Sequence, residues 1–353
     1  MPQSAPMPRH FAVIGAGLAG LACARTLLQA GHRVTVLERA AHVGGRMASC
    51  DTSFGSFDAG AQYFTVRDER FQRALDTAPG CWQPWSATSV RVLDALGHVV
   101  EAVAPSIERR WVGVPTMEAL PRAWAEPLAS SGALHLDTHV DAIEPDVLDR
   151  RRWQLRTSGP DESVHVYSGF DAVLLAIPAP QAALVLERSR LAPGFIEQLL
   201  RIDMAPCWSL MLAFPQALQP GLGHLGPQWN AAFSSHHRVA WLARESSKPG
   251  RGPVERWTVQ ASAPWSAEHF GDDGPRIEAK LLKAFSEITG IRAQPRHAQV
   301  QRWRYARTLQ PLGRSHLWDG RAGLGACGDW CLGHRVEDAF VSGLELALGA
   351  LGA

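Results

Sequence analysis

Lysine is almost absent from this sequence. The chain has 35 basic residues, but only Lys248, Lys280 and Lys283 are lysines, and 34 acidic residues bring the formal net charge to +1. A chain with this balance has no excess positive charge to hold a polyanion, so we expect no nucleic-acid partner. The shortage also leaves few amines that could act as a general base, which limits the chemistry considered below.

Paired cysteines and long apolar runs are also missing. The six cysteines are scattered, and the two nearest each other, Cys327 and Cys331, have no second pair close by. This pattern argues against a zinc site and predicts a reduced, cytoplasmic protein without a metal. No uninterrupted apolar run has membrane-spanning length, so we expect no membrane segment.

The clearest motif that is present lies near the N-terminus. A short apolar run, Phe11–Ile14, leads into Gly15-x-Gly17-x-x-Gly20, and a helical pattern follows over Leu18–Gln29. In such a unit the first glycine allows a tight turn, the second lets the backbone approach a pyrophosphate, and the third lets helix and strand pack closely. The N-terminus of the helix offers free N–H groups and a positive dipole end. We therefore predict a dinucleotide site rather than an ordinary βαβ unit.

Further signals extend this site along the chain. A second apolar run ends at Glu38, roughly twenty residues after the fingerprint, where a carboxylate can bind ribose hydroxyls. Gly44, Gly45 and Arg46 follow shortly afterwards. Near the C-terminus, residues 323–326 form another short apolar run before Gly328-Asp329 and a helical pattern over 333–348. These last pieces would complete the dinucleotide sheet.

The region from 189 to about 302 has a different character. It contains the strand-like runs SLMLAF, RVAWLAR and RWTVQAS, loops rich in glycine and proline, and one helical pattern over 275–288. Six tryptophans lie in it or at its edge: Trp208, Trp229, Trp241, Trp257, Trp265 and Trp303. They could form a core or line a flat aromatic pocket, and both interpretations stay open. We predict a discontinuous nucleotide-binding domain of residues 1–75, 130–188 and 305–353, with a substrate domain of residues 76–129 and 189–304.

Taken together, these motifs resemble a known family. Glu38-Arg39 followed by Gly44-Gly45-Arg46, with the distant Gly328-Asp329, resembles the flavin amine oxidase superfamily. The stretches FDAGAQYFT, WLARESSKPGR, WSAEHF, RWRYA and CGDWCLGHRVEDAFVSG are similar to the bacterial renalase group, over nearly the whole chain. The resemblance implies an α/β fold. Its parts would be a Rossmann-like FAD-binding domain of the glutathione-reductase type and an inserted α+β substrate domain built on a mixed sheet.

The same resemblance implies non-covalent FAD and assigns residues to its nucleotide end. Glu38 would hold the adenosine ribose, Arg46 would reach the phosphates, and Val140 would offer backbone contacts to the adenine. Arg39 is either a cofactor contact or an exposed charge. The pyrophosphate would meet the residues of the glycine-rich turns, which are Gly15, Ala16, Gly17, Gly20 and Gly45.

At the flavin end, Asp329 would bind the ribityl hydroxyls, although an aspartate there could instead cap the following helix. Arg335 and Val336 would begin that helix, whose dipole would stabilise negative charge on the reduced flavin. Cys327 and Cys331 are expected in the core rather than as covalent flavin attachments. The isoalloxazine and the substrate would lie against Ala61, Gln62, Tyr63, Phe64 and Thr65. Of these, Ala61 and Gln62 would contact the cofactor as well as the substrate.

The resemblance implies a reaction as well: oxidation of 2- and 6-dihydro isomers of NAD(P) to NAD(P)⁺, with hydride passing to the flavin and O₂ being reduced to hydrogen peroxide. A dihydropyridine becomes an aromatic cation by losing hydride alone, whereas oxidation of an alcohol needs a proton removed and oxidation of an amine needs the neutral amine. The scarcity of lysine fits the first case. Lys248 is predicted at the surface or against a substrate phosphate, and Lys280 and Lys283 on a solvated helix face.

Within this reaction we assign the catalytic roles to Gln62, which would orient the carboxamide of the nicotinamide, and to Tyr63. The substrate contacts are assigned to Ala61, Gln62, Tyr63, Phe64, Thr65, Trp241, Trp303 and Arg304. His236 could add a polar contact but is more consistent with a core position. Two alternatives stay open: an amine or porphyrinogen-type oxidase of the same fold, and a non-catalytic FAD-binding redox sensor. The expected partners are a small-molecule substrate and O₂, in a monomer or homodimer.

Overall fold

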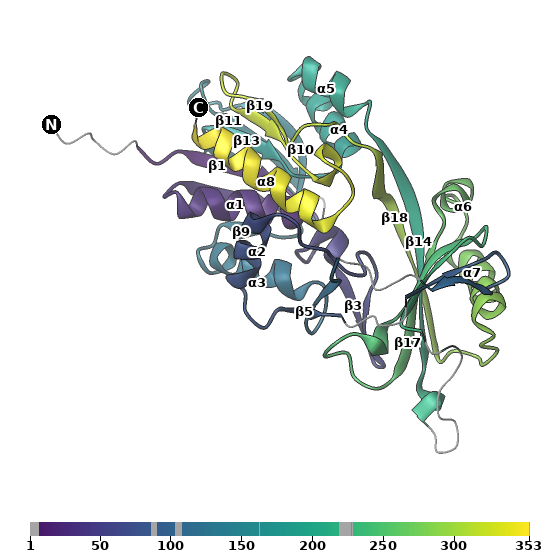
Figure 1. The fold of residues 1–353 in the computed structure, drawn as a ribbon. Coiled ribbons are helices and arrows are strands. Elements are labelled where there is room, and N and C mark those ends of the chain that lie inside the picture. The colour runs from purple at the N-terminus through teal and green to yellow at the C-terminus, as the bar shows by residue number, and fades with distance from the viewer. Residues whose placement is uncertain are drawn as a thin grey trace. The chain divides into compact units, whose positions relative to one another are not determined.

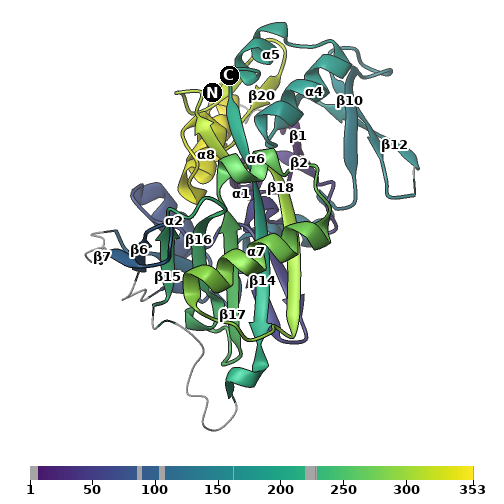
Figure 2. The same ribbon diagram turned by 90° about the vertical axis from the view of Figure 1, so that its right-hand side faces the viewer.

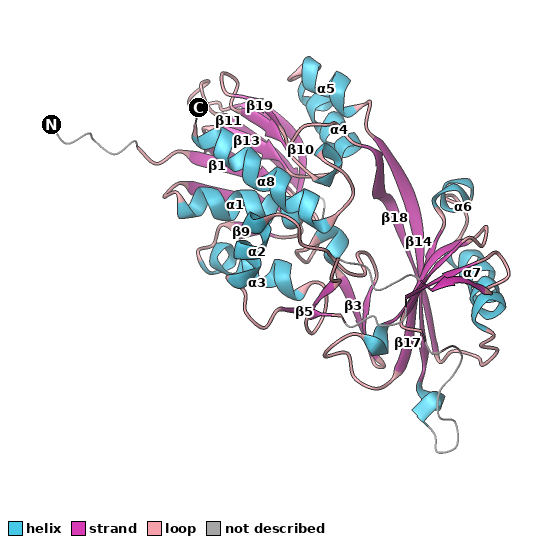
Figure 3. Ribbon diagram, in the orientation of Figure 1, coloured by secondary structure: helices cyan, strands magenta, loops and turns pink. Residues whose placement is uncertain are grey.

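A computed structural model describes residues 7–85, 90–102, 108–161, 163–218, 227 and 229–352 of this chain, and Figures 1 and 3 show its ribbon. The chain divides into two compact units, each of which mixes helices and strands. The nucleotide unit comprises residues 1–45, 121–203 and 308–353, and the sheet unit comprises residues 46–120 and 204–307. Each unit is therefore assembled from stretches that are separate in the sequence.

The nucleotide unit contains a six-stranded sheet in the order β19-β20-β13-β1-β2-β9. Its strands are β1 (His10–Ile14), β2 (Arg33–Leu37), β9 (Leu134–His135), β13 (Ala172–Leu175), β19 (Leu317–Asp319) and β20 (Leu324–Ala326). All pairings are parallel except that of β19 with β20. Every residue of β13 is buried, as expected of a parallel strand covered by helices on both faces. The apolar runs predicted around β1, β2 and β20 are thus confirmed as strands.

Helices α1 (Leu18–Gln29) and α8 (Val336–Leu351) pack closely against each other in this unit, as the purple and yellow helices of Figure 1 show. A side chain at Gly343 of α8 would overlap the backbone of Ala19 in α1, so the two helices approach to a distance that only glycine permits. This contact joins the two ends of the sequence.

The rest of the nucleotide unit is a smaller antiparallel sheet with flanking helices. Its strands are β10 (His139–Pro145), β11 (Trp153–Ser158) and β12 (Val164–Phe170), and the helices are α4 (Ala179–Ser189), α5 (Pro193–Leu199) and most of α3 (Ala119–Ser130). Within the described part of the chain, no helix combines the length and apolar composition that a membrane span requires.

A seven-stranded sheet forms the centre of the sheet unit, in the order β18-β14-β17-β16-β15-β6-β7. Its strands are β6 (Val90–Leu93), β7 (Val99–Ala102), β14 (Asp203–Phe214), β15 (Ala231–Ser234), β16 (Val239–Arg244), β17 (Glu255–Ala261) and β18 (His297–Gln310). One face is covered by α7 (Gly274–Thr289), with α6 (Ala263–Glu268) nearby (Figure 2). The core under α7 takes up four of the six tryptophans: Trp208, Trp229, Trp257 and Trp265. For these four, the core interpretation is the right one.

The opposite face of that sheet carries a hairpin, β3 (Ser49–Thr52) and β4 (Gly55–Asp58). Phe57 of the hairpin and the following Ala59 are buried against Met211 and Ala213 of β14, with Trp303 beside them. We predicted residues 46–75 to belong with the nucleotide-binding fold, but this packing places them in the sheet unit. The unit is completed by η1 (Gly45–Met47), α2 (Glu69–Asp76), β5 (Trp82–Pro84), β8 (Trp111–Gly113), η2 (Pro215–Leu218) and η3 (Glu245–Ser247).

Candidate active site

The turn between β1 and α1 has the geometry that its glycines predict. Gly15 takes a φ of 103°, and its N–H donates to the carbonyl of Leu37 at 2.8 Å. A Cβ at Gly20 would overlap the carbonyl oxygen of Gly15, whereas a Cβ at Gly17 would meet no atom of the described residues within 4 Å. Gly20 therefore serves packing, and Gly17 faces open space. That space is what close approach of a pyrophosphate requires.

Glu38 is held in place at the end of β2. Its carboxylate accepts one hydrogen bond from the backbone N–H of Ala16 at 2.7 Å and another from that of Ala40 at 2.9 Å. A carboxylate has about four acceptor positions, so these two bonds fix its orientation and leave capacity for hydroxyl donors. Arg39 is exposed, as the surface-charge interpretation predicts.

At the other end of the nucleotide unit, Asp329 lies in the short helix η4 (Asp329–Cys331) and is only 3% exposed. It accepts a hydrogen bond from the Thr308 hydroxyl at 3.4 Å. The alternative in which Asp329 caps the last helix is wrong, because α8 begins after Arg335 and the carboxylate of Asp338 accepts from the Arg335 N–H at 2.9 Å. Arg335 and Val336 do begin α8, as predicted.

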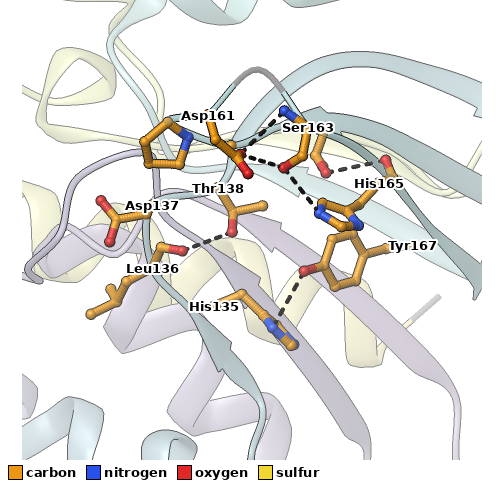
Figure 4. Close-up of a pocket in the computed structure, with 11 residues that line it drawn as sticks. His135, Leu136, Asp137, Thr138, Asp161, Ser163, His165 and Tyr167 are labelled. Carbon is orange, nitrogen blue, oxygen red and sulfur yellow. Dashed lines mark hydrogen bonds between the residues drawn. The ribbon is translucent and has the colours of Figure 1, made fainter.

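A polar hollow of about 350 Å³ lies beside β9 and the small antiparallel sheet (Figure 4). The Tyr167 hydroxyl lies 3.4 Å from Nδ1 of His135, and the Ser163 hydroxyl 3.2 Å from Nε2 of His165. Glu38 is adjacent in the backbone, since its N–H donates to the His135 carbonyl at 2.9 Å. The hollow is therefore next to the ribose candidate and to β10, where Val140 is buried. It has the polar lining of a binding surface but no catalytic arrangement.

In the sheet unit, the predicted substrate-contacting run starts from a firmly held loop. The Trp303 indole N–H donates to the carbonyl of Ala59 at 3.0 Å, and the Gln260 amide donates to that of Gly60 at 2.7 Å. The Ala61 N–H donates to the carbonyl of Arg46 at 2.9 Å, and the Arg46 guanidinium donates to Ala306 at 3.3 Å. The loop is thereby fixed both to the sheet and to the segment carrying Arg46.

The end of the run is less accessible than predicted. Phe64 exchanges backbone hydrogen bonds with Trp111, each 2.8 Å long. Its ring is 2% exposed and packs edge to face on Phe71. The Phe64 ring is therefore part of the interior. A ligand would meet Ala61–Tyr63 first.

Lys248 is the largest departure from the sequence prediction. Its side chain is completely buried, and Nζ lies 2.9 Å from Asp58 Oδ2, 2.9 Å from Glu245 Oε1 and 3.2 Å from Gln62 Oε1. The buried Arg251 also pairs with Asp58. We call Asp58, Glu245, Lys248 and Arg251 the charge cluster. The predicted surface or phosphate-contacting position of Lys248 is wrong, because its carboxylate partners compensate its charge inside the protein.

Two opposite pKa shifts follow within the charge cluster. Burial disfavours ionisation of Asp58, but the nearby charges of Lys248 and Arg251 outweigh it and lower the pKa of this carboxyl. Burial raises the pKa of Glu245, and repulsion from Asp58 adds to the rise. Asp58 is thus held as a carboxylate, while Glu245 is the group whose charge is easier to remove.

The charge cluster also determines what Gln62 can do. The amide nitrogen of Gln62 donates to the carbonyls of Asp58 and Gly60, and its oxygen accepts from Lys248. Both ends of the amide are therefore engaged. The contact we predicted from Gln62 to a nicotinamide carboxamide would need these bonds to open. Gln62 instead holds the loop that presents Tyr63.

Aromatic side chains gather around Tyr63. Its ring centroid lies 5.7 Å from that of Trp241 and 6.4 Å from that of Trp85. The guanidinium carbon of Arg110 lies 5.4 Å from the same ring centroid, and Phe233 packs edge to face on Trp241 at 4.7 Å. The predicted pair of Tyr63 and Trp241 is therefore brought together. Trp85 and Arg110 were not predicted.

Arg304 and His236 were the other two candidates for polar contacts with the substrate. Arg304 lies over the ring of Phe270 at 4.8 Å, whereas its neighbour Trp303 bonds to the loop on the other side of β18. Successive residues of a strand face opposite ways, so these two cannot contact the same small ligand as we predicted. His236 is 7% exposed, with Nε2 3.5 Å from Glu287 Oε2, which agrees with the core interpretation.

Comparison with known proteins gives the family. The profile of flavin-containing amine oxidoreductases matches residues 87–348, about three quarters of the chain, and that of NAD(P)-binding Rossmann-like domains matches residues 13–78. The chain belongs to the flavin-containing amine oxidoreductases. Its cofactor is accordingly FAD, and no group of three histidine, cysteine, aspartate or glutamate residues in the described part of the chain is arranged to bind a metal ion.

Solved structures share the fold of this amine oxidoreductase. A protein described as a protoporphyrinogen oxidase from Exiguobacterium sp. 255-15 is 13% identical, with a TM-score of 0.76 over 98% of this chain and 99% of that one. Putrescine oxidase bound to putrescine is 12% identical, with a TM-score of 0.70 over 98% and 100%. At such identities the likeness shows the fold alone.

Curated relatives of this amine oxidoreductase match over short segments. An L-amino-acid oxidase from Bungarus fasciatus is 58% identical over 40 residues, and a phytoene dehydrogenase from Streptomyces griseus is 48% identical over 59 residues. These segments cover 11% and 17% of this chain and 8% and 12% of those proteins. The relatives differ in what they oxidise, so the substrate must be inferred from the site itself.

Proposed function

We propose that this flavoenzyme oxidises the 2- and 6-dihydro isomers of NAD(P) to NAD(P)⁺, with O₂ reduced to hydrogen peroxide, as the renalase-like stretches of its sequence suggest. The observation that carries the proposal is the environment of Lys248. All three N–H donors of its ammonium group are engaged by Asp58, Glu245 and Gln62. A lysine held in this way has no N–H left to bind a substrate or a bridging water.

The other two lysines offer no base either. Lys280 pairs with Asp272 at 3.0 Å, and Lys283 has a side chain that is 70% exposed. An amine substrate carries a proton that must be lost before hydride can leave, so its oxidation gains from a nearby base. A dihydropyridine needs none. Its oxidation depends instead on positioning the ring, which is a matter of shape and contact.

The groups around Tyr63 suit such a substrate. Tyr63, Trp85 and Trp241 present flat apolar rings, which bind planar heterocycles well. A polyamine would instead need free carboxylates, but the two in the charge cluster are already paired with Lys248 and Arg251. These contacts favour a planar substrate over a polycationic one.

FAD would supply the two-electron acceptor. In the proposed arrangement, of the glutathione-reductase type, the open space at Gly17 takes the pyrophosphate, Glu38 holds the ribose, and Asp329 holds the ribityl chain. The open face of Gly17 and the buried, oriented carboxylates fit these roles. Gln62 and Lys248 hold the loop that places Tyr63 against the substrate.

The test is anaerobic mixing of the purified holoenzyme with 6-dihydro-NAD, 2-dihydro-NAD, ordinary 4-dihydro-NAD, putrescine and a porphyrinogen, followed by flavin absorbance. We expect rapid bleaching and formation of NAD⁺ with the first two only. Bleaching by putrescine or the porphyrinogen, and not by the isomers, would establish the amine or porphyrinogen-type alternative. Reduction by none of them would favour the redox sensor.

A further inference from the structure

Two buried donors near Tyr63 have no acceptor among the residues that the structure describes. The indole N–H of Trp241 and the Nε–H of Arg110 are both shielded from solvent and lack a hydrogen-bond partner. Both side chains contact Tyr63, since the Trp241 ring lies 5.7 Å and the Arg110 guanidinium 5.4 Å from its ring centroid. Native proteins pair nearly all buried donors, and an exception calls for an explanation such as a missing ligand. Two exceptions around one ring indicate that an acceptor from outside the chain completes this group.

The charge of Arg110 narrows the class of ligand. Among the described residues, no carboxylate lies within ion-pair distance of its guanidinium. Lys248, which lies over the neighbouring Trp85 ring, is compensated by the charge cluster. An unneutralised guanidinium over an aromatic ring offers a fork of donors that matches a phosphate in shape and charge. The aromatic surfaces beside it suit a flat ring joined to that phosphate.

We propose that Tyr63, Trp241 and Arg110 form a subsite for a nicotinamide nucleotide, in which Arg110 pairs with the phosphate and the Trp241 N–H donates to an oxygen of the same ligand. This assignment rests on the proposed function and sharpens it. The enzyme would select phosphorylated dihydronicotinamides over the uncharged riboside. Arg110 would be the residue that determines this selectivity.

The test compares two substrates that differ only in the phosphate, the 6-dihydro forms of nicotinamide mononucleotide and nicotinamide riboside. The variant is Arg110→Met, which keeps much of the side-chain length and removes the charge. The matched control is Arg109→Met at the adjacent, exposed arginine. We expect Arg110→Met to lower the ratio of kcat/KM for the mononucleotide to that for the riboside about tenfold or more, the loss typical of a charge-assisted hydrogen bond. Arg109→Met should leave the ratio unchanged.

A second variant, Trp241→Phe, keeps an aromatic ring and removes the N–H. It should lower kcat/KM for both substrates by a similar factor, because the oxygen it contacts is common to them. An unchanged ratio in Arg110→Met, or an equal fall of the ratio in Arg109→Met, would overturn the subsite. Flavin content and urea midpoints of all variants identify any that fold poorly, and Arg110→Lys, which keeps the charge, should recover part of the ratio.

Failure of the proposed function is distinguishable from failure of the subsite. If the wild type oxidises neither substrate, the function fails, and binding then decides the subsite. Oxidised holoenzyme is titrated with nicotinamide mononucleotide and with the riboside, and the shift of the flavin spectrum is followed. Tighter binding of the mononucleotide that is lost in Arg110→Met supports the subsite. Equal binding of the two ligands to the wild type refutes it.

Discussion

Replacing Lys248 by methionine is the sharpest single test of the charge cluster. The change keeps most of the aliphatic stem and removes a cation that contacts two buried carboxylates at 2.9 Å each. Asp58 would keep Arg251, and Glu245 would keep the hydroxyl of Thr258 at 2.8 Å and a longer ion pair with Arg251 Nε at 3.9 Å. Breaking a buried ion pair from one side costs roughly 3–5 kcal/mol, because the other charge is left uncompensated. We expect Lys248→Met to lower the free energy of unfolding by an amount in that range.

The measurement is urea unfolding followed by tryptophan fluorescence, which reports on the core under α7 through Trp208 and Trp257. With a slope of about 2–3 kcal/mol per molar urea, the expected loss lowers the midpoint by roughly 1–2 M. Lys283→Met is the matched control. Its exposed ammonium lies 3.9 Å from Glu287, and such surface pairs contribute about 0–1 kcal/mol.

A double variant separates lost charge pairing from poor packing. Glu245→Gln removes the charge and keeps an oxygen that can accept from Thr258. If the uncompensated carboxylate causes the loss, Glu245→Gln combined with Lys248→Met should be more stable than Lys248→Met alone. The reasoning would be refuted by a midpoint close to that of the Lys283→Met control, or by a double variant whose losses simply add.

Three further predictions concern the cofactor, the pH and the thiols. Gly17→Ala should keep the urea midpoint of the wild-type apoprotein but lose at least about tenfold in FAD affinity by flavin fluorescence titration. Gly20→Ala should fold poorly, because a methyl group at residue 20 overlaps the backbone whereas one at residue 17 does not. The raised pKa of Glu245 means that its stabilising contribution is present below its unfolded pKa and is lost as the pH rises through the folded value, so urea midpoints from pH 4.5 to 8 should decline less in Glu245→Gln than in the wild type. Burial raises the pKa of the Cys327 thiol well above its usual value and that of Cys331 to about 12, so both should react with Ellman's reagent only after unfolding. If neither thiol carries the flavin, acid denaturation should release all of it. Flavin retained on the precipitated protein would contradict non-covalent binding.

The parts that sequence predicted well are those determined by neighbouring residues. The glycine turn, α1 and Glu38 fall within a single βαβ unit, where spacing alone specifies the geometry. The buried strand β20 was also recognisable, because strands covered on both faces are continuous apolar runs. Local pattern was sufficient for these elements.

The charge cluster could not be predicted in the same way. Asp58 and Lys248 are 190 residues apart. Nothing in the Ser-Ser-Lys-Pro-Gly segment indicates that acidic residues contact this lysine in the folded protein. The assignment of the β3–β4 hairpin to the wrong unit has the same origin, since its partners Met211 and Ala213 lie far along the chain. Trp85 and Arg110 likewise joined Tyr63 without any recognisable spacing. Arg304 is different, because the alternation of a strand could have separated it from Trp303 in advance.

The contact between Gly343 and Ala19 has a consequence for how the protein is made. The sheet unit is complete once residue 307 has been synthesised, whereas β20 and α8, which pack beside β13 and α1, are synthesised after it. Because domains can fold as their sequence becomes available, the sheet unit can fold first, at a stage when α1 still lacks α8, the helix it packs against. A nascent chain therefore passes through a stage in which the apolar face of α1 is uncovered and Asp329 is not yet in position. In the proposed arrangement, FAD would contact both the early segment with Gly17 and the later segment with Asp329, and so would hold them together once both have been synthesised.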